Sequence, residues 1–131
     1  MITIMIKIER KLHKLDATGK AVGRLASQIA LILRGKNKAE YLPHIDGGDM
    51  VLVSNIDKFK FTGKKIEQKV YQHYSGYQGG LKTKKISEMK PEQILREAVR
   101  DMLPKTKHRI NMLRRLIIAI PGAAHKADKA K

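Results

Sequence analysis

The residues best suited to chemistry lie in one stretch, from Tyr71 to Lys85. This stretch holds three of the four tyrosines, three glycines within five residues, and three lysines in its last four positions. Glycines let a backbone approach a phosphate closely, and lysines attract phosphate groups. Tyrosine rings stack on bases or sugars. Such a stretch could cradle the phosphates of a small nucleotide in an enzyme, or it could lie along a polynucleotide.

The enzyme hypothesis has three weak supports. Residues 19–24 open a helix after a strand, where anions bind, but they match neither G-x-x-x-x-G-K-[ST] nor G-x-G-x-x-G. His73 and Ser75 could be a base and a nucleophile, but this alternate spacing is common by chance. Residues 43–49 hold one histidine and two aspartates that could ligate a metal, yet Asp-Gly-Gly-Asp is also good turn chemistry. We favour the turn and predict no enzyme activity, no cofactor and no metal.

The charge of the chain favours nucleic acid. Its 131 residues carry 28 Lys+Arg and 12 Asp+Glu, for a net charge of +16, which repels itself unless a polyanion neutralises it. Residues 58–85 hold eight lysines and one acid, and residues 102–127 hold six Lys+Arg and no acid. Residues 88–101, with four acids and three bases, are close to neutral. The positive charge therefore lies on predicted loops and element ends, where binding residues are common.

Other classes of protein fit less well. No apolar run approaches the ~20 residues that span a bilayer, and the first residues lack the basic region of a signal peptide. We therefore expect no membrane partner and an intracellular location. The absence of cysteine removes disulfides and thiolate metal sites. The length predicts one domain over residues 1–131, with a loose basic tail at 123–131.

Hydrophobic periodicity predicts an α/β fold. A strand at 12–17, an amphipathic helix from Val22 that ends at Gly35, and a buried strand at 50–53 form a βαβ unit. The two strands of such a unit are parallel.

The second half of the chain is predicted to continue this pattern. A second helix lies between Pro91 and Pro104, and a shorter helix near 110–115 leads into a strand at 116–120. Residues 58–85 are predicted to form an extended hairpin or long loop. The alternating isoleucines of residues 1–8 predict a short strand.

Many short motifs follow one another in an informative order. They are Asp16–Lys20, Gly23–Ser27, Leu33–Lys36, Lys38, Tyr41, Pro43, His44, Asp46, Gly48, Asp49, Asn55, Thr62–Lys65, Ser75–Tyr77, Gly79, Gly80, Lys82, Ala98, Val99 and Met102–Lys105. Over roughly residues 12–122, this order resembles the L thirteen family of bacterial-type large-subunit ribosomal proteins. The resemblance implies a three-layer α/β/α fold with a small, mostly parallel four-stranded sheet.

The resemblance also implies a function. Members of the family are structural constituents of the large ribosomal subunit that bind ribosomal RNA during assembly, beside other ribosomal proteins, without a cofactor or a small-molecule substrate. It implies a cytoplasmic or an organellar ribosome. The chain departs from the family in three places: His108 replaces a frequent glycine, only His125 represents a histidine-rich ending, and residues 1–11 extend past the resemblance.

We predict that the RNA-binding residues form three groups. The hairpin group would clamp folded RNA, with Tyr74 and Tyr77 stacking on sugars or bases; it comprises Lys64, Lys65, His73, Tyr74, Ser75, Gly76, Tyr77, Gly79, Gly80, Lys82, Lys84 and Lys85. The second group, in the last third of the chain, comprises Lys105, Arg109, Arg114 and Arg115. The third is a cationic edge near the first helix, comprising Lys20, Arg24, Arg34, Lys36 and Lys38, together with His44. A messenger-RNA regulator and a phosphoryl-transfer enzyme or nuclease remain as alternatives.

Overall fold

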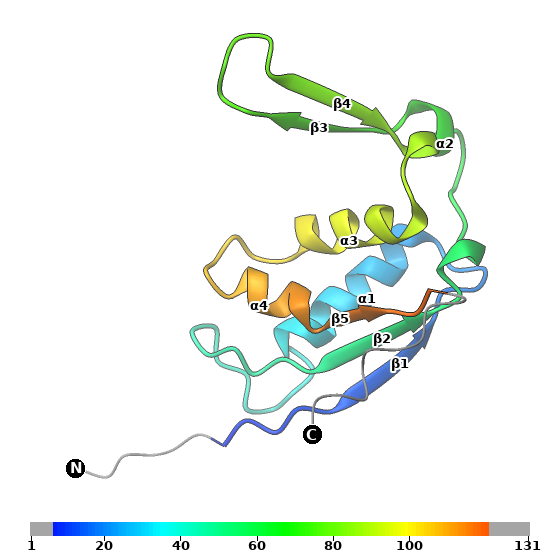
Figure 1. Cartoon of the computed structure of the whole chain (residues 1–131). Coiled ribbons are helices and arrows are strands. Elements are labelled where there is room, and N and C mark those ends of the chain that lie inside the picture. Colours follow the sequence, from blue (N-terminus) through cyan, green and yellow to red (C-terminus); the bar gives the residue numbers. More distant parts are fainter. Residues whose placement is uncertain (1–6, 121–131) are drawn as a thin grey trace.

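The computed structural model of the chain describes residues 7–120 (Figure 1). Two short 3-10 turns, at Ile56–Lys58 and Ile86–Glu88, accompany the helices and strands. In chain order, the latter are β1 (Leu12–Asp16), α1 (Val22–Arg34), β2 (Met50–Ser54), α2 (Lys65–Gln68), β3 (Val70–Tyr74), β4 (Leu81–Lys85), α3 (Pro91–Met102), α4 (Arg109–Arg114) and β5 (Leu116–Ile118). The predicted α/β class, its βαβ unit and the order of the predicted elements after residue 11 are confirmed, and the hairpin is the form that residues 58–85 take; the short helix α2 was not predicted.

A parallel sheet with the strand order β1–β2–β5 forms the base of the molecule. β1 and β5 each pair with β2 in parallel, so that Val51 lies between His13 and Leu116. Both crossovers step across the sheet in the same direction, and right-handed crossovers then place their helices on the same face. Figure 1 shows α1, α3 and α4 together on one side of the sheet.

This arrangement corrects one expectation. The resemblance implied a four-stranded sheet between two helical layers, but residues 7–120 form a three-stranded parallel sheet with one helical layer. The predicted hairpin, β3 with β4, forms a separate antiparallel sheet and adds no strand to the first. Residues 7–11 have no regular structure, and residues 1–6 of the predicted N-terminal strand lie outside the described part of the chain, as does the tail at 123–131.

The helices bury the faces that their periodicity predicts. In α1, the apolar positions from Val22 to Leu33 recur every three or four residues and are buried against the sheet and α3. Gly35 ends this helix with φ 81°, and its N–H donates to the carbonyl oxygens of Leu31 and Ile32. The left-handed conformation at this position favours glycine. No helix within residues 7–120 is long and apolar enough to cross a membrane.

The turn after β1 is stabilised by Asp16. Its carboxylate accepts hydrogen bonds from the backbone N–H and the hydroxyl of Thr18, at 3.0 and 2.8 Å, and from the side chain of Asn55 at 3.1 Å. The Thr18 N–H contributes most to lowering the pKa of Asp16 to about 2, followed by the Thr18 hydroxyl and Asn55. The turns after β1 and β2 are therefore joined to each other.

The departure at His108 has no conformational cost. His108 adopts φ −76° and ψ −15°, an ordinary right-handed conformation just before α4. A glycine is therefore not required at this turn.

The close contact between Gly48, in the loop before β2, and Leu33, near the end of α1, can be tested by mutation. A Cβ at Gly48 would collide with the carbonyl oxygen of Leu33 and lie 2.9 Å from a guanidinium nitrogen of Arg115. We expect Gly48→Ala to lower the free energy of unfolding by about 1–3 kcal/mol in urea denaturation. At Gly23, in α1, a Cβ would meet nothing within 4 Å, so Gly23→Ala should stabilise the protein by up to about 1 kcal/mol. If Gly48→Ala and Gly23→Ala have the same free energy of unfolding, the described contact between Gly48 and Leu33 is wrong.

Candidate nucleic-acid interface

The β3–β4 hairpin sorts its side chains onto two faces. Residues directly opposite each other in an antiparallel pair point to the same side. Tyr71 pairs with Lys84, and His73 pairs with Lys82. These four residues form what we call the inner face, because half-buried Tyr71 packs against the hydrophobic core. The basic side chains of His73, Lys82 and Lys84 lie beside it and are exposed.

The inner face turns toward α3. Burial raises the pKa of the Tyr71 hydroxyl, and the nearby carboxylates of Asp101 and Glu97 on α3 raise it further. Figure 1 shows the hairpin projecting from the body on the side of α3 and α4. The segment that joins these helices carries Lys105 and Lys107, both exposed, and leads to half-buried Arg109. The projecting hairpin and this segment are therefore two separate sources of positive charge.

The hairpin tip is built for close approach. Gly76 and Gly79 have φ of 90° and 72°, a conformation that other residues rarely adopt. The Ser75 N–H donates to the Gly80 carbonyl at 3.4 Å, which closes the tip. Tyr77, at the end of the tip, is 79% exposed.

More lysines gather where the hairpin joins the body. A shallow pocket of about 190 Å³ lies there, beside the first turn of α1. Lys60, Lys65 and Lys69 line it together with Tyr71, and the ammonium of Lys69 lies 5.2 Å from the ring centroid of Tyr71. Lys65 is among the predicted RNA contacts, whereas Lys60, Lys69 and Lys107 are not. The positive net charge of residues 58–85 and 102–127 includes these three lysines, but they lie outside the short motifs from which the RNA contacts were predicted.

The predicted cationic edge near α1 is divided in two. Lys20 and Arg24 lie at the start of the helix, near the hairpin base, because the Lys60 N–H donates to the Lys20 carbonyl at 2.9 Å. Arg34 and Lys36 lie at the other end, about 18 Å away by the rise of a helix of this length. The guanidinium of Arg34 lies 5.7 Å from the ring centroid of Tyr41. Exposed His44 belongs to this far end.

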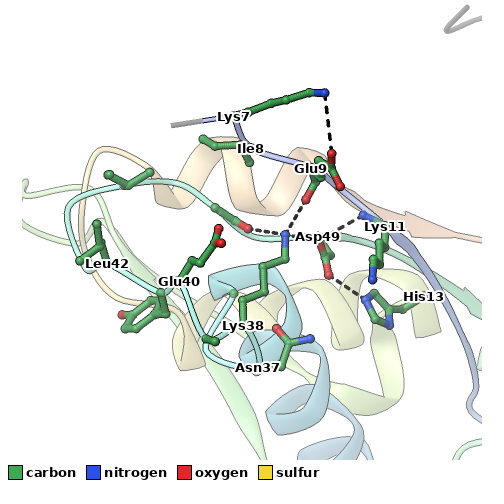
Figure 2. Close-up of a pocket in the computed structure, with 15 residues that line it drawn as sticks. Lys7, Ile8, Glu9, Lys11, His13, Asn37, Lys38, Glu40, Leu42 and Asp49 are labelled. Carbon is green, nitrogen blue, oxygen red and sulfur yellow. Dashed lines mark hydrogen bonds and ion pairs between the residues drawn. The ribbon is translucent and has the colours of Figure 1, made fainter. Parts of the chain in front are cut away.

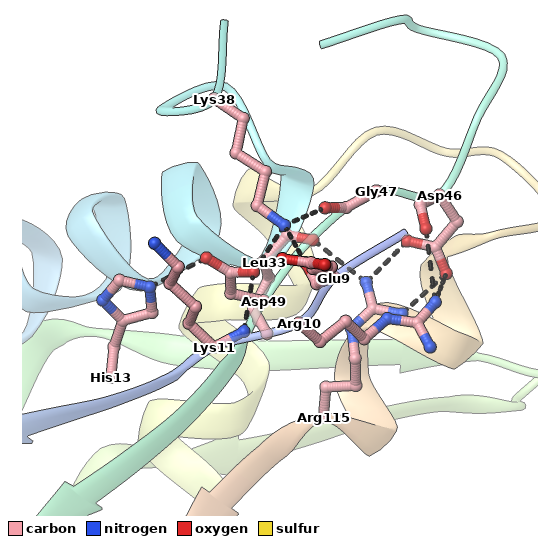
Figure 3. A network of polar contacts seen from close by, with 10 residues as sticks. All are labelled: Glu9, Arg10, Lys11, His13, Leu33, Lys38, Asp46, Gly47, Asp49 and Arg115. Atoms are coloured by element: carbon pink, nitrogen blue, oxygen red, sulfur yellow. Dashed lines mark hydrogen bonds and ion pairs between the residues drawn. The ribbon is translucent and has the colours of Figure 1, made fainter. Parts of the chain in front are cut away.

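Lys38, the remaining member of the edge, faces inward, as Figure 3 shows. Its ammonium lies 2.6 Å from Oδ1 of Asp49, a residue only 1% exposed. It also donates to the carbonyl oxygens of Glu9 and Gly47, at 2.7 and 2.9 Å. The predicted RNA contact of Lys38 is therefore replaced by an intramolecular role, because its donors are already used.

Asp49 is the centre of this network. The backbone N–H of Lys11 donates to its Oδ1 at 3.1 Å, and Nε2 of His13 lies 2.8 Å from its Oδ2. Burial alone would raise the pKa of Asp49, but the hydrogen bonds from Lys38, His13 and the Lys11 N–H outweigh burial and lower it. The carboxylate therefore stays charged at neutral pH and joins β1 to the loop before β2.

Arg115 is also an internal residue. Its guanidinium binds Asp46 in a bidentate ion pair, with both nitrogen–oxygen distances at 2.6 Å, and donates to the Leu33 carbonyl at 3.1 Å. Its side chain is only 11% exposed. Burial opposes ionisation of Asp46, but the hydrogen bond and charge of Arg115 prevail and lower the pKa of that carboxyl. We therefore remove Arg115 from the predicted RNA contacts, whereas Arg114 beside it is exposed.

The segment at 43–49 thus does more than form a turn. Within residues 7–120, no three His, Asp or Glu side chains are grouped to hold a metal, and its two carboxylates already face cationic partners. Beside it, an open cavity of about 660 Å³ is lined by the loop after α1 and by Lys7, Ile8, Glu9, Lys11 and His13 (Figure 2). Lys38, Asp49 and His13 form part of its wall. This cavity lies at the end of α1 away from the hairpin.

The fold and the charge distribution define a basic α/β protein with a projecting cationic hairpin. The sequence profile of the family "Ribosomal protein L13" matches residues 10–125. The chain is 50% identical over 123 residues to the large ribosomal subunit protein uL13 of Rubrobacter xylanophilus, covering 91% of this chain and 86% of the relative. It is 49% identical over 134 residues to the uL13 protein of Thermotoga maritima, covering 97% and 90%.

The chain therefore belongs to the ribosomal protein L13 family and is a structural protein of the large ribosomal subunit, not an enzyme.

The Asp49 network can be tested by removing its charge. Asp49→Asn keeps the size of the side chain but leaves the ammonium of Lys38 without a carboxylate. We expect the free energy of unfolding to fall by about 3 kcal/mol in urea denaturation. The control Glu97→Gln removes a surface pair with Arg100, at 3.3 Å, and should cost less than about 0.5 kcal/mol. Similar losses in the two variants would show that the network is not stabilising.

The lowered pKa values of Asp46 and Asp49 predict acid sensitivity. As pH falls, the unfolded chain binds protons first, near the ordinary aspartate pKa of about 3.9, so the stabilisation is complete above that range. It is lost as pH falls through the lower pKa values of the folded state. Unfolding curves measured from pH 7 to pH 3 should show the loss beginning near pH 4. Asp49→Asn should lose less stability than the natural protein over this range, whereas Glu97→Gln should follow the natural protein.

Proposed function

We propose that this large-subunit protein binds ribosomal RNA between its hairpin and the segment that joins α3 to α4. The observation that carries the proposal is the sorting of charge: the inner face of the hairpin holds three basic side chains, those of His73, Lys82 and Lys84, and no acid. The segment on the other side contributes Lys105, Lys107 and Arg109. Folded RNA carries phosphates on both edges of its grooves, so two separate cationic elements can hold it together.

The hairpin tip is proposed to meet the RNA backbone or an exposed base. Tyr77 is the most exposed aromatic ring that the structure describes, and such rings stack on bases without sequence preference. The glycines at 76, 79 and 80 let the backbone amides approach a phosphate. Recognition is then mainly of RNA shape, because side chains cannot read the deep groove of an RNA helix.

A second contact area is proposed at the base of the hairpin. Lys20, Arg24, Lys64 and Lys65 lie around the start of α1 with Lys60 and Lys69, and they can extend the same RNA site toward the body. Arg34, Lys36 and His44, at the far end of α1, would have to meet a different RNA segment. Arg114 and the outward Lys85 complete the proposed contacts.

The proposed RNA contacts suggest a role in assembly of the large subunit. By joining separated RNA segments, the protein would support assembly of the large subunit beside other ribosomal proteins. Its relatives in Rubrobacter and Thermotoga are bacterial, which supports a place in a cytoplasmic ribosome of the bacterial type. A role as a regulator on messenger RNA would use the same surface, and unrelated RNA would then bind as tightly as ribosomal RNA.

The inner face provides the test. We expect the affinity for a large-subunit ribosomal RNA fragment to fall with salt at a log–log slope of about −6 to −7, if about eight phosphates are neutralised. Lys82→Gln with Lys84→Gln should weaken binding and reduce the size of this slope by about 1.5 to 2. The matched control, Lys11→Gln with Lys14→Gln, removes the same charge from the β1 side and should leave the slope nearly unchanged. A slope near −1, or equal effects of the two pairs, would contradict the interface.

A further inference from the structure

The outer face of the hairpin is different in chemistry from the inner face. It comprises Val70, Gln72 and Tyr74 on β3, opposite Lys85, Thr83 and Leu81 on β4. Val70, Tyr74 and Leu81 are 40%, 62% and 56% exposed. Its single charge, Lys85, lies at the base next to Val70, so the distal part is uncharged. A projecting arm of a protein with net charge +16 therefore presents exposed apolar side chains on both sides of the polar, uncharged pair of Gln72 and Thr83.

The position of this face follows from that of Tyr71. Tyr71 packs against the core from the inner side of β3, and successive residues of a strand point to opposite sides. Tyr74 and Val70 therefore point away from the body. The pairing of Tyr74 with Leu81 places an aromatic ring beside a branched aliphatic side chain, a common type of apolar contact surface.

We infer that the outer face docks on an apolar surface of a neighbouring protein in the same subunit, while the inner face holds RNA. This inference rests on the proposed RNA-binding function. RNA is a poor occupant of the distal outer face because no cation there can neutralise a phosphate, so we reassign Tyr74 from the predicted stacking on RNA to this protein contact. A second copy of this chain is a poor occupant because two molecules of charge +16 repel each other. An uncharged protein surface matches both the apolar side chains and the absence of charge.

The small area of the outer face determines the conditions under which it can bind a partner. Two five-residue strands about 17 Å long and roughly 5 Å apart cover only a few hundred Å² at most. A stable interface buries about 800 Å² on each partner. The contact is therefore too small to form a complex alone, and it forms only after RNA has placed both proteins in one particle. The test must use assembled subunits.

Site-specific photo-crosslinking distinguishes the two faces. Full-length protein carrying Tyr74→p-benzoylphenylalanine or, on the inner face, His73→p-benzoylphenylalanine is incorporated into large subunits, which are purified and irradiated. We expect the Tyr74 adduct to survive ribonuclease and to contain peptides of one other subunit protein. We expect the His73 adduct to be lost on ribonuclease digestion.

The outcomes separate the two proposals. A Tyr74 adduct with RNA, with this chain itself or with a second copy would overturn the docking inference, as would no Tyr74 adduct while His73 still captures RNA. Failure of His73 to capture RNA would count against the RNA interface, and a protein adduct at Tyr74 would still support docking.

A second measurement uses the unmodified amino acids. Val70→Ser with Leu81→Ser alters only exposed positions of the outer face that are not among the predicted RNA contacts, so affinity for the isolated RNA fragment should change by less than about twofold. In washed subunits, however, this double variant should be released at lower salt than the natural protein, because salt screens phosphate contacts but not apolar ones. Equal retention of the two proteins would overturn the inference.

Discussion

The pairing of Asp46 and Asp49 with cations from distant segments is the interaction on which the rest of the structure depends. Asp49 joins the loop after α1 to β1 through His13 and is also paired with Lys38 of the same loop. Asp46 joins that loop to the start of β5 through Arg115. This loop has little regular structure of its own. In a chain of net charge +16, the cations that converge here would repel one another without these carboxylates. The two ion pairs therefore hold together the end of the sheet at which β2 and β5 begin.

These internal pairs decide which cations remain for a partner. Lys38 and Arg115 are used inside the molecule, and two acids of α3, Glu92 and Glu97, form surface pairs with Arg96 and Arg100. The positive charge that has no internal partner then gathers on the hairpin and on the segment before α4. A two-stranded hairpin alone is marginally stable in water, so its orientation depends on Tyr71 and Ile86, which attach it to the core.

The hairpin then gives one small protein two kinds of contact. Strand alternation sends Lys82 and Lys84 to one side and Tyr74 and Leu81 to the other. The first set suits phosphates, and the second suits an apolar protein surface. A structural protein of a ribonucleoprotein particle needs both, since it lies between RNA and other proteins. Side chains alternate between the two faces of a β-strand, and this alternation also directs RNA and protein to opposite faces of the hairpin.

The sequence by itself determined most of the elements and their order, though not the short helix α2. It also determined the buried faces of α1 and α3 and the excess of charge on residues 58–85, because periodicity, turn residues and charge are local properties. It could not determine whether the sheet has three or four strands, since strand pairing joins segments far apart in the chain. Nor could it separate Lys38 and Arg115, which are internal, from Lys82 and Lys84, which are exposed, because a lysine or arginine has the same sequence signal in both settings. Only the tertiary structure decided this, by bringing the carboxylates of Asp49 and Asp46 within 2.6 Å of Lys38 and Arg115, whereas Lys82 and Lys84 form no ion pair with any residue between 7 and 120.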